Sequence, residues 1–559
     1  MNPSGRLGSR EPDPGGGGGE EGTTSAARDS LRIAGWTLVS RLTGVVRVAA
    51  IGAVLGPTLL GNTFLFTNTL PNLVYYGFLA GALFSSLLVP ALVGAMDAGD
   101  RSAAERIAGG FLGVTAVAAA VVAGAAVLVG PVLLRLGALG TQAEAVGAAQ
   151  ERAGRLLLLL VIPQVLLYAV IASSTAVMNA RRRFALAAAA PALENLGILV
   201  VLGATAVLFG AAGEIDSVPG PQLVLLGAGA TAAVALHAAV QWWGARRAGV
   251  TLRPRAGWRD PDVTVLVRRA LPALALAAVT ALQLLTVLVL ANRVAGGVVA
   301  VQLGLNVHYF VVALGATPVA LSLLPRLSRL DSVVRFRETL GRGLALVLFL
   351  TVPAAVGCAL LARPLAEVVA VGRMGSAAGV ALVATTVAAL AAGMVGEGVF
   401  QVLTFACYAR KDTWAPLRSM AVQAGTFSVL ASSALVVRPG QVPLVLGLSF
   451  AAANLVGAWH LALRSRRALG TLGGGLAPCA RRVLAGAALM APPVWAAAVL
   501  VPRWVGGRPG WLIAAAAAAA LGAAVFLLLQ SWWGAPELAW ARRGGVRFRS
   551  GAATVGDAP

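Results

Sequence analysis

The sequence predicts an all-α, polytopic membrane protein with about fourteen transmembrane helices. Of the 559 residues, 58% are hydrophobic and only 12% are charged, whereas soluble domains are about half apolar and a quarter charged. Apolar runs of about 20 residues, enough for one helix to span a bilayer, recur until most of the chain is used. These observations exclude an ordinary soluble globular protein.

The individual spans are apolar runs between charged or Gly- and Pro-rich breaks. The second run contains Pro71, and proline favours a kink because it removes a backbone donor. The expected spans are residues 32–55, 63–93, 108–134, 156–178, 186–210, 221–244, 271–292, 298–324, 343–363, 379–406, 417–437, 441–463, 483–502 and 510–533.

Two terminal segments fall outside these spans. Residues 1–30 contain five consecutive glycines and mixed charges, and such a composition cannot bury enough apolar surface to order itself. The segment lacks the charged start, apolar core and small-residue cleavage site of a signal peptide. We expect residues 1–30 to be a disordered cytoplasmic tail and residues 541–559 to be a second cytoplasmic tail.

The distribution of basic residues predicts the orientation. The tails and the loops after even-numbered spans hold 33 of the 44 Lys and Arg residues, whereas the loops after odd-numbered spans hold nine. Because cytoplasmic loops are enriched in Lys and Arg, both termini are expected in the cytoplasm. Topology and contact with anionic membrane lipids therefore explain the net charge of +22, and nucleic-acid binding is not expected.

A weak internal repeat, at an offset of about 230 residues, predicts two lobes. Residues 86–90 resemble residues 322–325, and the segment 179–191 resembles 408–416. Each motif pair is separated by six helices, so the two halves have the same orientation, as in transporters built from parallel repeats. We expect an N-lobe at 31–250 and a C-lobe at 251–465 around a central cavity, with an appended helix pair at 466–540.

Arginines inside the first span are the leading candidates for function, because charge within a bilayer is costly. Arg41 and Arg47 lie in this span, and a guanidinium presents a planar set of donors that fits phosphate oxygens. We expect them to bind an anionic, phosphorylated substrate. The structural alternative is that one of them snorkels to an interface or pairs with a carbonyl. On an ideal helix their side chains point about 120° apart, so a shared site needs a broad cavity or a bend near Gly44.

Two carboxylates also lie within spans. Glu397, in the tenth span, has three interpretations: it carries a coupling proton, pairs with an arginine, or makes a structural hydrogen bond. Glu194, early in the fifth span, is expected to have a structural role with the basic cluster at residues 181–183. The three histidines lie far apart in apolar segments and are expected to be structural.

Patterns typical of enzymes and metal sites are absent from the sequence. It contains no GxxxxGK[ST], no HExxH, and no GxSxG in a strand-turn-helix setting. The three cysteines form no CxxC pair. We therefore expect neither an enzyme, nor a cofactor, nor a metal site.

Four groups of residues together resemble a known family. They are Ser40-Arg41-x-x-Gly44-x-x-Arg47; Leu70-Pro71-Asn72-Leu73 with Gly81, Phe84-Ser85 and Pro90; Met178-Asn179-Ala180-x-x-x-Phe184 with Pro191 and Asn195; and Tyr408-Ala409-x-x-Asp412-Thr413 with Pro416. The chain resembles the MurJ/MviN lipid II flippases of the multidrug/oligosaccharidyl-lipid/polysaccharide exporter superfamily. The likeness runs from about residue 31 to the last helices, and the family's fourteen-helix, two-lobe plan agrees with the span count above.

The resemblance implies a transporter of the bacterial plasma membrane that flips lipid II, an undecaprenyl-pyrophosphate-linked peptidoglycan precursor, from the inner to the outer leaflet by alternating access. Membrane potential or an ion gradient would supply the drive. Arg41 and Arg47 match cavity arginines of the family, which hold the pyrophosphate. Ser40 and Asn72 match polar positions that line the cavity.

Three departures from the family pattern leave alternatives open. Asn62 stands where the family often has an acidic residue, and Tyr75 and Asn306 stand where it has further arginines. Either the substrate is bound with more neutral hydrogen bonds, or transport is altered or lost. The alternatives are an exporter of another polyprenyl-linked saccharide or of amphiphilic drugs, and a non-transporting homologue that partners cell-wall synthesis proteins.

Overall fold

The computed structural model describes residues 18–74, 88–138, 144–181, 183–210, 214–471 and 475–538. Within these ranges helices follow one another through short connections and no β-strand occurs, which confirms the all-α prediction. The helices are α1 (Gly18–Leu55), α2 (Leu59–Val74), α3 (Val89–Asp97), α4 (Arg101–Ala138), α5 (Glu144–Val161), α6 (Gln164–Ala180), α7 (Phe184–Phe209), α8 (Gly220–Arg247), α9 (Pro261–Ala291), α10 (Gly297–Leu327), α11 (Val333–Leu360), α12 (Ala362–Val369), α13 (Ala377–Leu390), α14 (Gly393–Ala409), α15 (Trp414–Ala431), α16 (Val442–Leu469), α17 (Leu476–Val505) and α18 (Gly507–Trp532), with short 3₁₀ turns η3 (Gly257–Arg259), η4 (Gly372–Gly375), η5 (Ser432–Leu435) and η6 (Pro439–Gln441).

Twelve of the fourteen predicted spans correspond to single helices or to broken ones that could cross a membrane. The fourth span is divided between α5 and α6, and the tenth between α13 and α14, which are bent by 44°. Eleven helical segments are long and apolar enough to cross a membrane, or twelve with this bent pair. The other two expected spans are the second, whose residues 75–87 lie outside the described ranges, and the eleventh, where α15 carries Arg418 and Gln423.

Helix α1 begins at Gly18, inside the segment expected to be a disordered tail. Residues 25–28 are mostly good helix formers and continue without a break into the apolar run. The 38 residues of α1 correspond to about 57 Å, more than the roughly 30 Å of a bilayer core, so its first turns extend beyond the membrane. Residues 1–17 and 539–559, which include the expected C-terminal tail, lie outside the described ranges.

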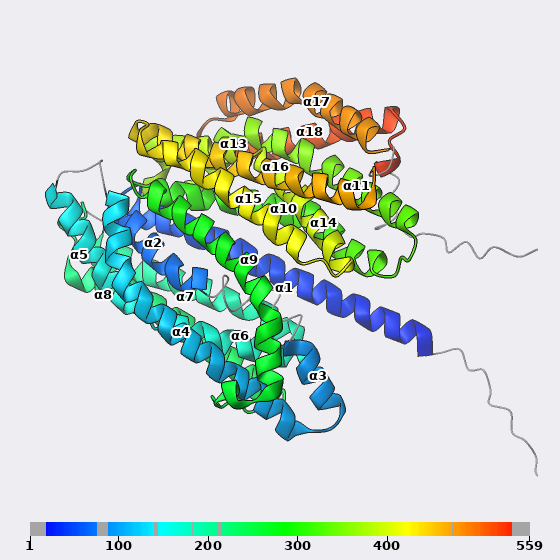
Figure 1. Ribbon diagram of the computed structural model, residues 1–559. Helices are drawn as coiled ribbons and strands as arrows, with labels where there is room; N and C mark the ends of the chain where they lie inside the picture. The colour runs from blue at the N-terminus through cyan, green and yellow to red at the C-terminus, as the bar shows by residue number, and fades with distance from the viewer. Residues whose placement is uncertain are drawn as a thin grey trace, which may run out of the picture.

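The helices form two groups and an appended pair (Figure 1). Helices α1 to α8 occupy the lower part of the view and α10 to α16 the upper part, with α17 and α18 on the far side of the upper group. Helix α1 runs along the boundary: it packs extensively on α7 and meets α10 and η4 of the upper group. The lower group lies within residues 31–250 except for the start of α1, the upper group lies mostly within 251–465, and α17 and α18 lie within 466–540.

Helix α9 links the two lobes. Asp260 caps its start by accepting hydrogen bonds from the backbone N–H groups of Asp262 and Val263, and it also pairs with Arg106 of α4 in the N-lobe. After its other end, Arg293 donates to the carbonyl of Ala434 in the C-lobe (2.7 Å). The predicted boundary between lobes at residue 251 therefore precedes a helix that contacts both.

The largest buried core lies where the lobes meet. It joins Ile51 of α1 and Leu60 of α2 to Val298 of α10 and Met374 of η4. Separate cores lie inside the N-lobe and inside the C-lobe. Because packed interiors resist rearrangement, the two lobes can act as semi-rigid bodies with α1 between them.

Candidate functional site

Hydrogen bonds hold the lobes together at the end of the molecule where α1 finishes and α10 begins. The Asn62 amide is fully buried: its Nδ2 donates to the Val294 carbonyl (2.7 Å), and its Oδ1 accepts from the Val298 N–H (3.1 Å). Gln150 of α5 donates to Asn292 Oδ1 (3.1 Å). We call this region, defined by these five residues, the closed end. The distribution of basic residues predicts that it is external.

Asn62 was expected to line the central cavity, but its side chain lies in the contact between the lobes at the closed end. Its Nδ2 bonds to the turn between α9 and α10 and its Oδ1 to the first turn of α10, and leaving either of them unsatisfied in the interior would be costly. An ionised aspartate in this position can accept but cannot donate, so it could not make the bond to the Val294 carbonyl. The asparagine suits a tie between the lobes.

Arg41 and Arg47 lie on different faces of α1, as the helical spacing predicts. Arg47 faces α7 of the N-lobe. Arg41 shares the stripe of Val48 and Gly52, and Gly52 faces the C-lobe, where an added Cβ would lie 3.1 Å from Cβ of Met374. At Arg41, two to three turns farther from the closed end, this stripe is exposed, and Arg41 has no ion-pair partner among the described residues.

Arg47 belongs to a buried polar cluster inside the N-lobe. Its Nη1 lies 3.4 Å from Glu194 Oε1, and the Tyr168 hydroxyl donates to the same oxygen (3.1 Å). His237 Nδ1 lies 3.0 Å from Glu194 Oε2. The side chains of Arg47, Glu194 and His237 are 19%, 9% and 5% exposed. We call these four residues the N-lobe cluster. The Arg47 Nε is buried and has no hydrogen-bond partner in the described part of the chain.

Close packing of α7 on α8 positions this cluster. An added Cβ on Gly197 would lie only 2.6 Å from Cβ of Ala233, so only glycine permits this approach. Glu194 lies one turn before Gly197 and His237 one turn after Ala233, and residues three or four apart share one helix face. The tight crossing therefore brings the carboxylate to the imidazole.

Asn195 fastens α7 to α1 beside the cluster. Its Nδ2 donates to the Ser40 carbonyl (3.2 Å) and to the Thr43 hydroxyl (3.0 Å). Two of the sequence motifs that carry the family resemblance, one on α1 and one on α7, thus contact each other. Ser40, an expected cavity residue, contributes its backbone to this contact.

The expectation that Glu194 lies with the basic cluster at 181–183 differs from what the structure describes. Glu194 is ten residues into α7, about 15 Å from its start, and it pairs with Arg47 and His237. This pairing and the hydrogen bond that Tyr168 donates to Glu194 were not predicted from the sequence. The sequence did contain an indication of this pairing. A carboxylate inside a membrane span needs a cation or hydrogen-bond donors, and few other polar side chains in the sequence lie at the same depth as Glu194.

Glu397 lies in a second cluster, inside the C-lobe. His308 Nε2 is 2.9 Å from Glu397 Oε2, and Asn454 Nδ2 donates to the same oxygen (3.5 Å). His308 is fully buried, whereas the Glu397 side chain is 29% exposed. Gly396 lets α14 approach α16, because an added Cβ would lie 2.6 Å from the backbone of Asn454. Within the described residues no arginine pairs with Glu397. We call Glu397, His308 and Asn454 the C-lobe cluster.

Two further expected residues that the structure describes, Asn72 and Asn306, are not brought into either cluster. Asn72 lies near the end of α2 and is half-buried. Tyr75 lies outside the described ranges. Asn306 is half-buried on α10, and its Nδ2 is buried without a hydrogen-bond partner among the described residues.

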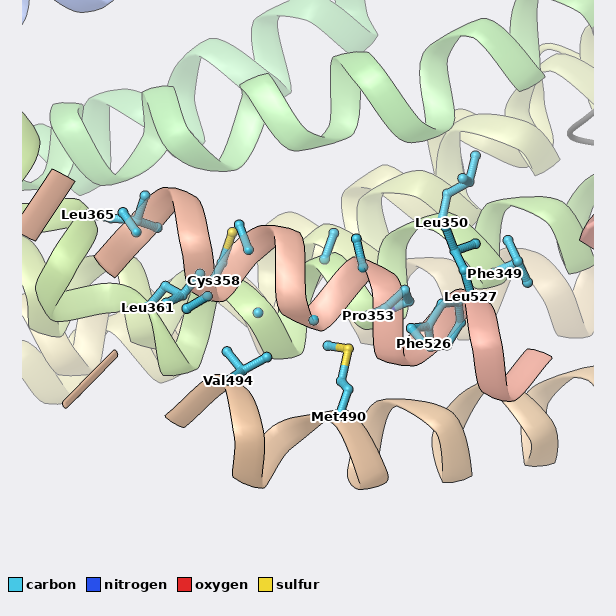
Figure 2. Close-up of a pocket in the computed structure, with 17 residues that line it drawn as sticks. Phe349, Leu350, Pro353, Cys358, Leu361, Leu365, Met490, Val494, Phe526 and Leu527 are labelled. Carbon is cyan, nitrogen blue, oxygen red and sulfur yellow. The ribbon is translucent and has the colours of Figure 1, made fainter. Parts of the chain in front are cut away.

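An apolar cavity lies apart from both clusters, between α11 and the appended pair (Figure 2). Its volume is about 390 Å³. Side chains of α11, α17 and α18 line it, among them Phe349, Pro353, Met490, Val494 and Phe526. Such a surface suits a hydrocarbon chain. Among the described residues no group of three or more His, Cys, Asp or Glu side chains could hold a metal ion.

Comparisons with known proteins agree with this architecture. A model of the lipid II flippase MurJ family matches residues 51–513. The chain is 28% identical over 397 residues to the probable lipid II flippase MurJ of Haemophilus influenzae, covering 68% of this chain and 76% of that protein. It is 26% identical over 404 residues to the lipid II flippase MurJ of Burkholderia cenocepacia, covering 70% and 75%.

Solved structures share the fold. A lipid II flippase MurJ in an inward closed conformation matches with a TM-score of 0.70 at 13% identity, covering 90% of this chain and 98% of that one. An inward-facing multidrug resistance MATE transporter of the MOP superfamily matches with a TM-score of 0.57 at 11% identity, covering 78% and 95%. Because the family model covers most of its length, the chain belongs to the lipid II flippase MurJ family.

Proposed function

We propose that this chain flips lipid II from the inner to the outer leaflet of the bacterial plasma membrane by alternating access. The observation that carries the proposal is the depth of Arg41 and Arg47 along α1, the helix that runs at the boundary of the lobes. They lie about 21 Å and 12 Å from the end of α1 at Leu55, within the thickness of a bilayer core. Permanent cations at this depth suit the pyrophosphate of lipid II, because guanidinium groups bind phosphate oxygens in pairs.

The uneven contact between the lobes supports alternating access. Hydrogen bonds join them at the closed end, while the stripe of α1 that carries Arg41 is exposed farther along. With both termini in the cytoplasm, this state is closed toward the outside. Release outside would then require the Asn62 bonds to break and the lobes to close around Arg41.

The apolar cavity beside α11 offers a place for part of the isoprenoid chain (Figure 2). A polyprenyl lipid has to keep its tail in an apolar environment while its head group crosses. A cavity lined by Phe349, Met490 and Phe526 would hold a section of that tail by burial of apolar surface.

Glu397 is the proposed coupling residue. It is partly exposed and contacts His308 without an arginine, so its charge is not permanently neutralised. Intramembrane carboxylates next to histidine are suited to carry protons. The proton gradient would then drive the conformational cycle through the C-lobe.

A second candidate, a non-transporting homologue that serves cell-wall synthesis proteins as a partner, is favoured by one observation. Asn62 and Asn306 are uncharged where the family often has charged residues, and Asn62 ties the lobes together. The cavity has fewer cations than the resemblance implies. We favour the flippase because both α1 arginines are retained.

A depletion strain that lacks its own flippase separates these candidates. Lipid II in the outer leaflet is labelled from outside after this chain is expressed. Restoration of surface lipid II supports the flippase, whereas growth without surface lipid II supports the partner role. Unchanged accumulation of cationic drugs would exclude the exporter alternative.

The Arg41→Ala variant tests the arginine assignment. Because a charge-assisted hydrogen bond contributes about 1.5–3 kcal/mol, we expect surface lipid II to fall at least about tenfold while the protein still inserts. Arg438→Ala, in an exposed turn after α15, is the matched control and should rescue normally. Normal rescue by Arg41→Ala would refute its role in binding the pyrophosphate.

A further inference from the structure

We propose that Glu194 is the internal counterion of Arg47 and that Glu194 and His237 form a proton-binding site coupled to the binding of a diphosphate lipid. The proposal rests on the proposed function, because it takes Arg47 as a ligand of the diphosphate. It assigns a chemical role to the N-lobe cluster beyond that of a structural ion pair.

The geometry of the Arg47–Glu194 pair indicates that another anion can displace the carboxylate from Arg47. A single nitrogen of Arg47 approaches the carboxylate, at 3.4 Å, and the Nε has no partner within the described residues. A diphosphate offers several oxygens with the spacing that a guanidinium fork binds in pairs. It can therefore bind Arg47 better than Glu194 does, and Arg47 would turn from the carboxylate to the ligand.

The remaining groups around Glu194 cannot balance its charge once Arg47 has turned away. One titratable group faces the carboxylate from each helix packed on α7: Arg47 from α1, Tyr168 from α6 and His237 from α8. Tyr168 is neutral at physiological pH. The second ring nitrogen of His237 lies 3.4 Å from Nε2 of Gln241, so it faces an amide and not another charge.

A proton is the remaining way to neutralise the site. An isolated charge at 9% exposure carries a large desolvation cost, and buried groups avoid it by changing their protonation state. The proton would be taken from water and shared between Glu194 Oε2 and His237 Nδ1, which are 3.0 Å apart. Diphosphate binding therefore takes up one proton, and by linkage a lower pH strengthens binding.

The first test uses the protein without lipid. The infrared spectrum of Arg47→Gln should contain the carbonyl band of a protonated carboxylic acid at neutral pH. That band should disappear in the double variant with Glu194→Gln and persist in the double variant with Glu397→Gln. Absence from Arg47→Gln of both this band and the ring bands of a protonated imidazole, or persistence of the carboxylic-acid band without Glu194, would overturn the proposal.

The second test measures binding of undecaprenyl diphosphate to the wild-type chain and to Glu194→Gln in nanodiscs, between about pH 6 and pH 8. Uptake of one proton changes the dissociation constant by at most about tenfold per pH unit. Between pH 8 and pH 6 we expect the dissociation constant of wild type to fall several-fold more than that of Glu194→Gln. The variant corrects for titration of the lipid phosphates, which is the same for both proteins. The Glu194→Gln variant should bind more tightly than wild type at pH 8.

The outcomes distinguish the two proposals. Equal pH dependence in wild type and Glu194→Gln would overturn the proton-binding site and leave the flippase proposal intact. No binding by wild type at any pH would overturn the diphosphate coupling and count against the proposed function, whereas the infrared test would still report the Arg47–Glu194 pair itself.

Discussion

The N-lobe and the C-lobe place histidines at matching positions but put different partners beside them. Glu194 of α7 and Ser419 of α15 each lie three residues after the proline of the repeat motif. Each contacts a histidine of the next long helix: Glu194 contacts His237 of α8 (3.0 Å), and Ser419 contacts His460 of α16 (2.9 Å). Both halves of the repeat thus have a polar contact to a histidine on the next long helix, but at this position the N-lobe has a carboxylate, Glu194, and the C-lobe has a hydroxyl, Ser419.

The C-lobe has its carboxylate one helix earlier. Glu397 of α14 and Tyr168 of α6 each lie eleven residues before the matched motif at the end of their helix. In the N-lobe this position is a phenol that donates to Glu194, and in the C-lobe it is a carboxylate beside His308. In the N-lobe the hydroxyl is on α6 and the carboxylate on α7, whereas in the C-lobe the carboxylate is on α14 and the hydroxyl on α15.

This exchange gives the two lobes different electrostatics. The N-lobe carboxylate is nearly buried and faces a permanent cation, Arg47, whereas Glu397 is 29% exposed and has no arginine among the described residues. An arginine makes a site responsive to anions, and a carboxylate with only a histidine responds to protons. The comparison favours the two proposed roles: anion binding, with its linked proton uptake, in the N-lobe, and coupling to the proton gradient in the C-lobe.

The largest expected effect is on stability after Arg47→Ala. Removing one partner of a buried pair leaves a carboxylate that is costly to bury or must be neutralised by a proton, and we expect a loss of about 1–3 kcal/mol in the free energy of unfolding, since Arg47 is partly exposed. Adding Glu194→Gln should recover about 1 kcal/mol or more. Unfolding in mixed micelles measures each variant.

The C-lobe supplies the control for this double-mutant cycle. Arg47→Ala combined with Glu397→Gln should show additive effects, because the two clusters share no contact. Additivity between Arg47→Ala and Glu194→Gln would contradict the electrostatic difference between the lobes.

Glu397→Gln should abolish coupling to the proton gradient while leaving the stability of the protein nearly unchanged. The amide keeps an oxygen for the His308 contact, so we expect less than about 1 kcal/mol change in the free energy of unfolding. In proteoliposomes with an imposed proton gradient, lipid II flipping should fall to the rate seen without a gradient. A variant that still responds fully to the gradient would remove Glu397 as the coupling residue.

Tyr168→Phe should have a small effect, on stability and not on the response to a proton gradient. It removes one donor to Glu194 while Arg47 and His237 remain, so we expect a loss of about 0.5–1.5 kcal/mol in stability. Tyr408→Phe is the matched control, because no hydrogen bond of that hydroxyl occurs among the described residues. Equal losses in thermal stability for both variants would mean that the Tyr168 bond to the carboxylate contributes little.

The helical class, the sites of twelve of the fourteen spans and the positions of the two arginines on α1 could be predicted from residue order alone. Hydropathy over about 20 residues decides whether a segment enters the bilayer, and the helical repeat decides that Arg41 and Arg47 face different sides. The family motifs at residues 40–47 and 178–195 likewise lie within short stretches of sequence. These properties depend on neighbours along the chain.

The partners of the intramembrane charges depend on the packing of helices far apart in the chain. Arg47 and Glu194 are 147 residues apart, and Asn62 and Val298 are 236 apart. Whether Asn62 lines a cavity or ties the lobes, and whether Glu194 meets Arg181 or Arg47, follows from helix crossings set by close contacts such as Gly197 against Ala233. Hydropathy and spacing carry no information about those crossings, because side-chain shape determines which helix faces meet.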